Sequence, residues 1–253
     1  MTTIAPLPVL WRDDRLIALH KPPGWLVHRT GLDAGEHRVV LQALRDQIGQ
    51  PVWPVHRLDK GTSGVLLMAL DPEAASLLGQ AWMSAEVCKR YVAMVRGWPP
   101  HAVEVDHALV PDEAPEGTAP QPAQTRFRRL ATLSLPVPVD RYPSTRVALV
   151  EAEPLTGRRH QIRRHLKHLS HPIIGDATHG KGAHNRWWAE RLGGPRLWLH
   201  AAALSLVHPM TGEPLTVRSP WHPDEPESAI LNPDWTHLLR SEPWVAEVAS
   251  ALA

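Results

Sequence analysis

Several short segments of the chain have the apolar pattern of buried or half-buried strands. Residues 15–22 (RLIALHKP) and 64–70 (GVLLMAL) are apolar runs bounded by turn residues, which is typical of strands inside a sheet. Strand-like patterns recur in four later segments: KRYVAMVRGW (89–98), QTRFRRLATL (124–133), STRVALVEAEP (144–154) and RLWLHAAALSLVHP (196–209). The pattern therefore predicts a protein rich in strands.

Segments whose apolar residues recur at helical spacing lie between these predicted strands. Residues 39–49 (VVLQALRDQIG) have apolar spacing suited to a helix, and the final glycine supplies a C-terminal stop. Asp71 is a candidate N-cap, with Pro72 at the first position of a second helix. Residues 157–169 (GRRHQIRRHLKHL) carry apolar residues at helical spacing, with Thr156 available as a cap. Helices interleaved with hairpin-like strands predict an α+β fold, with a mixed, mainly antiparallel central sheet and flanking helices.

Composition narrows the class of protein. With 43% hydrophobic and 21% charged residues over 253 positions, the chain fits an ordinary globular protein. Cys88 is the single cysteine, which excludes an internal disulfide and fits a reducing compartment. No segment reaches the roughly 18 apolar residues of a membrane span, and the N-terminus lacks a signal-peptide pattern. We expect a cytoplasmic protein in which residues 111–124 form the one long loop.

Charge is unevenly distributed, although the formal net charge is only +1. Residues 156–200 hold nine Lys or Arg and two acids, whereas residues 222–253 hold six acids and one Arg. Such asymmetry indicates one face for a polyanion and another that faces solvent. The alternative is that this charge asymmetry is only sequence drift.

Residues 55–70 (VHRLDKGTSGVLLMAL) place charged side chains directly before a buried strand. Four charged or titratable residues precede the Thr-Ser-Gly turn into the apolar run: His56, Arg57, Asp59 and Lys60. A carboxylate on a rigid element at the edge of the core is well held for catalysis. The alternative is a turn aspartate that hydrogen-bonds its own backbone.

Two more positions have candidate chemistry. Tyr91 lies beside Lys89 and Arg90 at the start of a predicted strand, and it offers a stacking face and a polar tip for proton transfer. An ordinary half-buried strand tyrosine fits the same pattern. On the predicted basic helix, Arg163 directly follows the core-facing Ile162. A guanidinium close to the interior needs a carboxylate partner, because a buried unpaired charge is costly; a solvated basic face is the alternative.

Two further patterns are not specific. GDATHGKG (175–182) almost matches a phosphate-binding loop, but it ends in glycine where a magnesium-holding Ser or Thr is needed. His165, His168 and His171 recur at three-residue spacing, but the ligand set is poor for zinc and Cys88 is isolated. Neither pattern predicts nucleotide hydrolysis or a metal site.

Four segments in order resemble motifs of the RluA-type pseudouridine synthases: HRLDKGTSGVLLMAL, KRYVAMVRGW, TGRRHQIRRHLKHLSHPIIGD and LHAAALSLVHPMTGEPL. The resemblance covers Asp14 to Val217. Three stretches are further similar to the branch that acts on uridine-65 of tRNA: KPPGWLVHRTGLD, LRDQIGQ and DRYPSTRVALVEAEPLTGRRHQIRRHL. The resemblance implies the pseudouridine synthase fold. It also implies a single catalytic domain over residues 1–253, no separate N-terminal RNA-binding domain, and an acidic C-terminal extension over residues 218–253.

The resemblance also implies roles for individual residues. In this family the aspartate of the HRLD motif is the essential catalytic residue, and it corresponds to Asp59. The arginine that pairs with it corresponds to Arg163, and the active-site tyrosine that stacks on the uracil corresponds to Tyr91. Arg57 is expected to help evict the target base and to fill its place. Contacts to RNA are expected from residues beside these motifs: His56, Lys89, Arg90, Arg158, Arg159, His160 and Gln161.

The implied reaction detaches uracil from its ribose, turns it over and rejoins it through ring carbon 5. Nothing is oxidised and nothing leaves, so no cofactor and no metal is implied. The expected partner is tRNA, with no membrane and no obligate protein partner. Two alternatives stay open: the same isomerisation on ribosomal RNA, and a non-catalytic RNA-binding or RNA-folding module.

Overall fold

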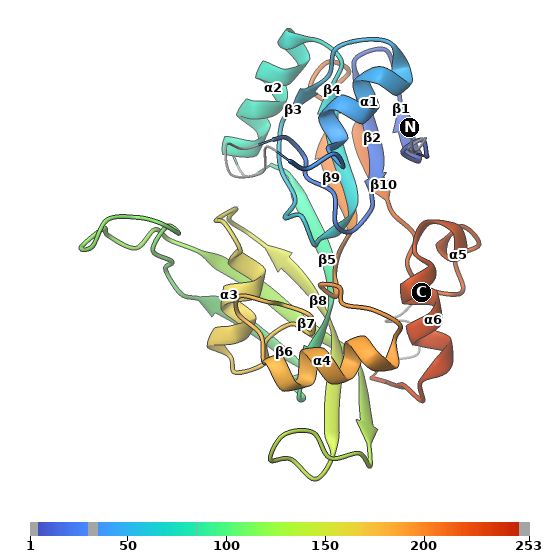
Figure 1. The fold of residues 1–253 in the computed structure, drawn as a ribbon. Helices are drawn as coiled ribbons and strands as arrows, with labels where there is room; N and C mark the ends of the chain where they lie inside the picture. Colours follow the sequence, from blue (N-terminus) through green and yellow to red (C-terminus); the bar gives the residue numbers. More distant parts are fainter. Residues whose placement is uncertain (1–4, 30–34, 85, 248–253) are drawn as a thin grey trace. The chain divides into compact units, whose positions relative to one another are not determined.

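The computed structural model of the protein describes residues 5–29, 35–84 and 86–247. These residues divide into two compact units. The first contains the chain up to Cys88 together with Ala201–Ser219, and the second contains Lys89–His200 and the chain from Pro220 onward. Figure 1 labels most of the helices and strands of both units.

The first unit is built on a sheet with the strand order β1-β2-β4-β9, in which β10 pairs with β9 and β3 with β4. β2 runs antiparallel to β4, from the pair Leu16 and Ala69 to the pair Lys21 and Gly64. The strands are β1 (Val9–Arg12), β2 (Leu16–Lys21), β3 (Trp53–Pro54), β4 (Ser63–Ala69), β9 (Leu199–Val207, in this unit from Ala201) and β10 (Pro214–Arg218).

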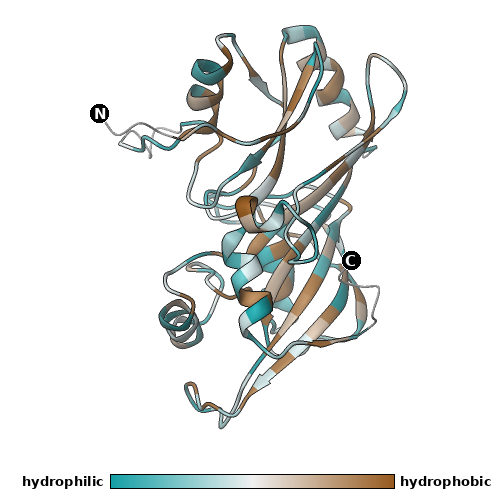
Figure 2. Ribbon diagram, turned by 90° about the vertical axis from the view of Figure 1, so that its right-hand side faces the viewer, coloured by the Kyte–Doolittle hydropathy of each residue, from teal (hydrophilic) through white to brown (hydrophobic). Residues whose placement is uncertain are grey.

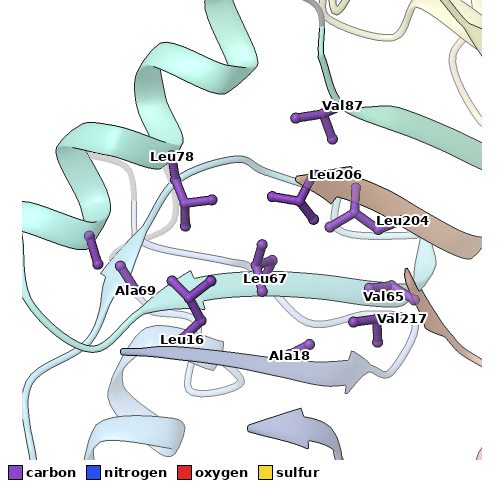
Figure 3. Close-up of a cluster of buried hydrophobic side chains, with 11 residues drawn as sticks. Leu16, Ala18, Val65, Leu67, Ala69, Leu78, Val87, Leu204, Leu206 and Val217 are labelled. Atoms are coloured by element: carbon purple, nitrogen blue, oxygen red, sulfur yellow. The ribbon is translucent and has the colours of Figure 1, made fainter. Parts of the chain in front are cut away.

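β2 and β4 are buried along their whole length, as their apolar runs predict. Figure 3 shows their side chains in one cluster with those of β9 and the helix α2 (Pro72–Met83), for example Leu16, Leu67, Leu204 and Leu78. Full burial of one such side chain stabilises a fold by roughly 1.5–3 kcal/mol. This core fixes the strand that follows the Asp59 turn.

In the first unit, one helix ends and another begins where the sequence predicts. α1 (Val40–Ile48) stops at Gly49, whose φ of 71° lies in the left-handed region that glycine adopts without strain. α2 begins after Asp71, whose carboxylate accepts a hydrogen bond of 2.9 Å from the backbone N–H of Ala74. Figure 2 shows hydrophobic and hydrophilic positions side by side on the helical ribbons, as expected for helices with one buried face.

The second unit has the strand order β5-β8-β7-β11, with β6 paired to β7. All of these pairs are antiparallel, and β7 and β8 form a long ladder from the pair Thr125 and Pro154 to the pair Leu135 and Thr145. The strands are β5 (Cys88–Arg96, in this unit from Lys89), β6 (Ala102–Asp106), β7 (Gln124–Leu135), β8 (Thr145–Pro154) and β11 (Val245–Ala246). The predicted α+β class with a mainly antiparallel sheet is confirmed.

The helices of the second unit are α3 (Gln161–His168), α4 (Gly182–Arg191), α5 (Ser228–Leu231) and α6 (Pro233–Ser241). The predicted cap of α3 is wrong. The N-cap is His160 in a left-handed conformation, and the hydroxyl of Thr156 instead donates a bond of 2.7 Å to Oε1 of Gln161. Across the described ranges, no helix is long and apolar enough to cross a membrane.

The acidic C-terminal segment is part of the second unit rather than a solvated tail. Trp235 and Leu238 of α6 have no exposed surface. Three carboxylates of the segment pair with arginines of the same unit: Asp234 with Arg196, Glu242 with Arg191, and Glu247 with Arg129. The acidic charge expected on a solvent-facing surface is therefore partly used in ion pairs.

Candidate functional site

The first group of predicted site residues lies in the turn between β3 and β4. Arg57 and Lys60 are exposed, whereas Asp59 is half-buried. The backbone N–H of Thr62 donates a hydrogen bond of 3.0 Å to the carbonyl of Asp59, which closes the turn before the buried Ser63 starts the strand. The carboxylate is thus delivered where the chain enters the core.

A buried lysine, which the sequence analysis did not single out, fixes this turn. Lys21 ends β2 and has no exposed surface. Its ammonium donates hydrogen bonds to the carbonyls of Pro22 (3.0 Å), Trp25 (2.8 Å) and Lys60 (3.2 Å), and so ties the residue after Asp59 to the end of β2. The lysine within an otherwise apolar strand run was the available signal, because a buried ammonium needs partners.

We expect Lys21→Met to destabilise the first unit. The methionine has a similar length, but it removes the Lys21 donor from the carbonyls of Pro22 and Trp25, whereas that of Lys60 keeps a bond of 2.8 Å from the backbone N–H of Gly24. The loss costs about 1–3 kcal/mol for each fully buried group left without a partner. Chemical denaturation followed by circular dichroism measures this loss. Lys60→Met, which removes an exposed ammonium and its ion pair with Glu36 (2.7 Å), is the control and should cost less, because exposed ion pairs contribute little stability. An equal change in both variants would contradict the anchoring role.

The strand after the turn depends on a glycine. Gly64 has a φ of 113°, and a Cβ built on it would collide with the backbone carbonyl of Ala201. β4 and β9 therefore approach each other more closely at this point than any residue with a side chain allows. The glycine of the Thr-Ser-Gly turn is thus required by packing.

His56 is held by the same unit. Its Nε2 accepts a hydrogen bond of 2.9 Å from the backbone N–H of Leu67, and its ring stacks on Trp82 with a centroid separation of 4.7 Å. β3 pairs with β4 only at Trp53 and Pro54, so the histidine ring supplies an acceptor just beyond this short strand. These contacts give His56 a structural role in the turn.

The second group of site residues lies in the other unit, around α3. Arg163 is 8% exposed, and its guanidinium makes a two-pronged contact with Asp176, with Nε to Oδ2 at 2.7 Å and Nη2 to Oδ1 at 2.8 Å. Asp59 belongs to the first unit, so the predicted contact between Asp59 and Arg163 stays a prediction. The sequence predicts a carboxylate partner for Arg163, and Asp176 is a partner that the sequence pattern did not identify.

Asp176 is itself firmly positioned. It is 2% exposed, and its Oδ1 also accepts hydrogen bonds of 2.9 Å from the backbone N–H groups of Thr178 and His179. Burial raises the pKa of Asp176, but the bonds from Arg163 and from these backbone groups outweigh it, so the pKa lies below its usual value. The stabilisation from the ionised form is therefore present above about pH 4 and is lost as the pH falls through the lowered pKa.

Tyr91 lies near the start of β5, opposite Ala152 of β8. Its side chain is half-buried, as is that of Lys89, whereas Arg90 is exposed. The three residues therefore alternate along the strand in the way the sequence predicts. Tyr91 and Arg163 belong to the same unit.

Gln161 serves the fold instead of an exposed surface. It is 4% exposed, and its amide donates to the carbonyl of Gln124 (2.9 Å) and to the hydroxyl of Thr125 (3.0 Å). Its Oε1 accepts bonds from Thr156 and from the backbone N–H of Arg158. All four hydrogen-bonding positions of the amide are thus occupied within the fold, and the expected contact of Gln161 with RNA stays a prediction.

An acidic loop contacts the basic residues at the start of α3, of which Arg159 is exposed and His160 and Arg164 are half-buried. Asp112 contacts Arg159 (3.4 Å), His160 (3.0 Å) and Arg164 (3.4 Å), and Glu113 contacts Arg159 (3.2 Å). The loop belongs to the long segment that the sequence predicts over residues 111–124. Its carboxylates form ion pairs with basic side chains that would otherwise be available to bind a polyanion.

The histidines at three-residue spacing contact other groups of the protein, and two of them share the neighbour His107. His165 is fully buried and hydrogen-bonded to Thr125 (2.9 Å) and to the carbonyl of His107 (3.0 Å), and His168 stacks on the ring of His107. His171 contacts the carbonyl of Arg96. Within residues 5–29, 35–84 and 86–247, no group of three potential ligands has the geometry of a metal site.

Comparison with known proteins gives consistent results for most of the chain. A family model described as RNA pseudouridylate synthase matches residues 15–168. A protein of Salmonella typhimurium named tRNA pseudouridine synthase C is 51% identical over 245 residues, which cover 94% of this chain and 90% of that protein. A protein of Vibrio vulnificus with the same name is 44% identical over 252 residues, covering 97% and 99%. Among solved structures, human RNA pseudouridylate synthase domain containing 1 has a TM-score of 0.70 at 25% identity, covering 98% of this chain and 92% of that one.

Proposed function

Since this chain belongs to the RNA pseudouridylate synthase family, we propose that it isomerises uridine to pseudouridine in tRNA, at position 65. The observation that carries the proposal is similarity across both units to relatives named tRNA pseudouridine synthase C. The matched family model, over residues 15–168, spans the segments that hold Asp59, Tyr91 and Arg163. An intact set of these three residues supports an enzyme over a non-catalytic RNA-binding module.

The proposed reaction breaks the bond between uracil N1 and the ribose and forms a bond from ribose C1′ to uracil C5. A proton leaves C5 and N1 gains one, so atoms and electrons balance within the nucleotide. The base cannot turn over inside a helix and must be flipped into a pocket, at a cost of a few kcal/mol. Asp59 acts on the flipped nucleotide as an anion, and Tyr91 stacks on the detached uracil.

The RNA substrate distinguishes the proposal from its nearest alternative. Purified protein is incubated separately with unmodified tRNA and with ribosomal RNA, and pseudouridine is located by chemical labelling that blocks reverse transcription. We expect one new label in tRNA, at position 65. Labelling only in ribosomal RNA would contradict the tRNA assignment, and labelling in neither RNA would contradict the enzyme.

We expect Arg57→Ala to lower the chemical step far more on folded tRNA than on a short unstacked oligonucleotide. Arg57 is exposed beside the Asp59 turn, and its proposed task is to stabilise the flipped state. A single strand has less stacking to overcome, so the loss there is smaller. Single-turnover rates on both substrates measure the difference. Equal losses on both substrates would assign Arg57 to phosphate positioning. Arg45→Ala, at an exposed position of α1, is the control.

We expect Asp112→Asn to strengthen tRNA binding. The change releases Arg159, His160 and Arg164 from their shared carboxylate, so that one more phosphate can be neutralised. The slope of log K against log salt should steepen by about one, and affinity at low salt should rise about three- to tenfold. Filter binding over a salt series measures both. Asp106→Asn, on β6, is the control, and unchanged affinity in Asp112→Asn would contradict the competition.

A further inference from the structure

A pocket lies in the second unit, where β5 ends, β8 begins and the chain leaves α3. It has a volume of about 360 Å³, within the range of small-ligand sites. Arg96, Tyr142, Arg146 and His184 contribute to its lining, and none of the residues that line it is acidic. Along β5, Arg96 is five residues from Tyr91, about 17 Å of extended strand. The pocket is therefore separate from the residues assigned to isomerisation.

The pocket contains buried polar groups that lack partners. His184 is 3% exposed, and neither of its ring nitrogens has a hydrogen-bond partner among the described residues. The Nε of Arg96 is likewise buried, and no partner for it is found within that part of the chain. A buried donor that makes no hydrogen bond is costly, so these groups are arranged for a ligand that accepts hydrogen bonds.

Cations dominate the surroundings of this pocket. The hydroxyl of Tyr142 accepts hydrogen bonds from Arg141 (3.2 Å) and Arg96 (3.4 Å), and these two guanidinium groups lower the pKa of Tyr142. The guanidinium of Arg146 lies over the ring of Trp98, 4.9 Å from its centroid. Burial and the charge of Arg96 lower the pKa of His184, and the exposed carboxylate of Asp140 opposes this shift. Three guanidinium groups against this one carboxylate favour an anion.

The wall that carries Arg96 is preformed. Its backbone N–H bonds to the carbonyl of Pro172 (3.0 Å), its Nη2 donates to the carbonyl of Ser170 (3.1 Å), and its own carbonyl contacts Nδ1 of His171 (2.8 Å). Gly97 permits this packing, because a Cβ there would lie 2.9 Å from the His171 ring at a φ of 75°. A rigid wall loses little freedom when a ligand binds.

We propose that this pocket binds a phosphate group, with Arg96, Arg146 and His184 as donors to its oxygens. Guanidinium groups match phosphate geometry with two parallel hydrogen bonds, and imidazole supplies a further donor. The phosphate comes either from the backbone of bound RNA or from a free mononucleotide. If it comes from RNA, this inference rests on the proposed function, and the site holds the substrate at a distance from the reacting base.

Binding experiments on the full chain test the proposal without reference to isomerisation. Inorganic phosphate and uridine 5′-monophosphate are titrated into protein labelled with ¹⁵N-histidine, and the ring nitrogens of His184 are followed by NMR. Affinity for tRNA is measured in parallel by filter binding. Arg146→Gln is the main variant, because this side chain is exposed and its loss leaves the core intact. Arg126→Gln, an exposed arginine of β7 paired with Glu104, is the matched control.

We expect a saturable shift of the His184 resonances with phosphate, weakened about tenfold by Arg146→Gln and unchanged by Arg126→Gln. Tyr142→Phe, which frees Arg96 from the hydroxyl, should alter the same affinity. A matching loss of tRNA affinity in Arg146→Gln identifies the RNA backbone as the source, and unchanged tRNA affinity identifies a free mononucleotide. The proposal is overturned if phosphate leaves His184 unshifted while tRNA affinity is equal in both arginine variants. It is also overturned if Arg146→Gln and Arg126→Gln weaken phosphate binding equally.

Discussion

Asp59→Asn is expected to abolish pseudouridine formation. The side chain keeps its size and still fits the turn held by Lys21, but the amide cannot act as an anion on the ribose. Phosphate contacts dominate RNA affinity, so binding of tRNA should stay within about threefold of the unchanged protein. The loss should therefore appear in the rate of the bound complex rather than in its formation.

Single-turnover assays with saturating protein separate these two quantities for Asp59→Asn. Asp46→Asn, at an exposed position of α1, controls for the loss of one carboxylate. Asp59→Glu adds a test of position, because it keeps the charge but moves it by one methylene. A near-normal rate in Asp59→Asn would remove this carboxylate from the mechanism.

Local features of the fold could be predicted because their causes are local. The glycine stop at Gly49 and the cap at Asp71 each depend on backbone groups within about four residues, and both were predicted from their own segments. The same reasoning failed at Thr156. Its hydroxyl is within reach of α3, but it bonds to Gln161, whose amide also holds β7.

The parts of the site that depend on distant segments could not be predicted in this way. Lys21 reaches a carbonyl 39 residues away, and no spacing rule links an ammonium to an unspecified backbone oxygen. Asp176 lies in the GDATHGKG segment, whose glycines resemble a phosphate-binding loop and whose carboxylate has no recognisable pattern. Arg163 was expected to need a carboxylate, but its neighbours in sequence do not identify which one.

Arg163→Lys is expected to lower the rate of isomerisation about a hundredfold, the size of effect that a misplacement of about 1 Å produces. Asp176 holds the guanidinium by two parallel hydrogen bonds. An ammonium keeps the charge but cannot reproduce this planar contact, so its position relative to Asp59 is lost. The predicted pairing of Arg163 with Asp59 then fails even though the net charge is unchanged.

Asp176→Asn separates the role of the Asp176 carboxylate from that of the Asp59 carboxylate, since both are expected to contact Arg163. Breaking a buried ion pair by removing one partner typically costs about 3–5 kcal/mol, so this variant should unfold at lower denaturant. If Asp176 orients Arg163 for Asp59, the folded fraction of Asp176→Asn should also isomerise uridine more slowly at saturating RNA. Asp59→Asn should lose this rate without a comparable loss of stability. A double-mutant cycle in the single-turnover rate, built from the charge-conserving variants Asp59→Glu and Arg163→Lys, measures the coupling of the two residues. Additive effects in that cycle would contradict the pairing, and Asp176 would then be the partner that explains Arg163.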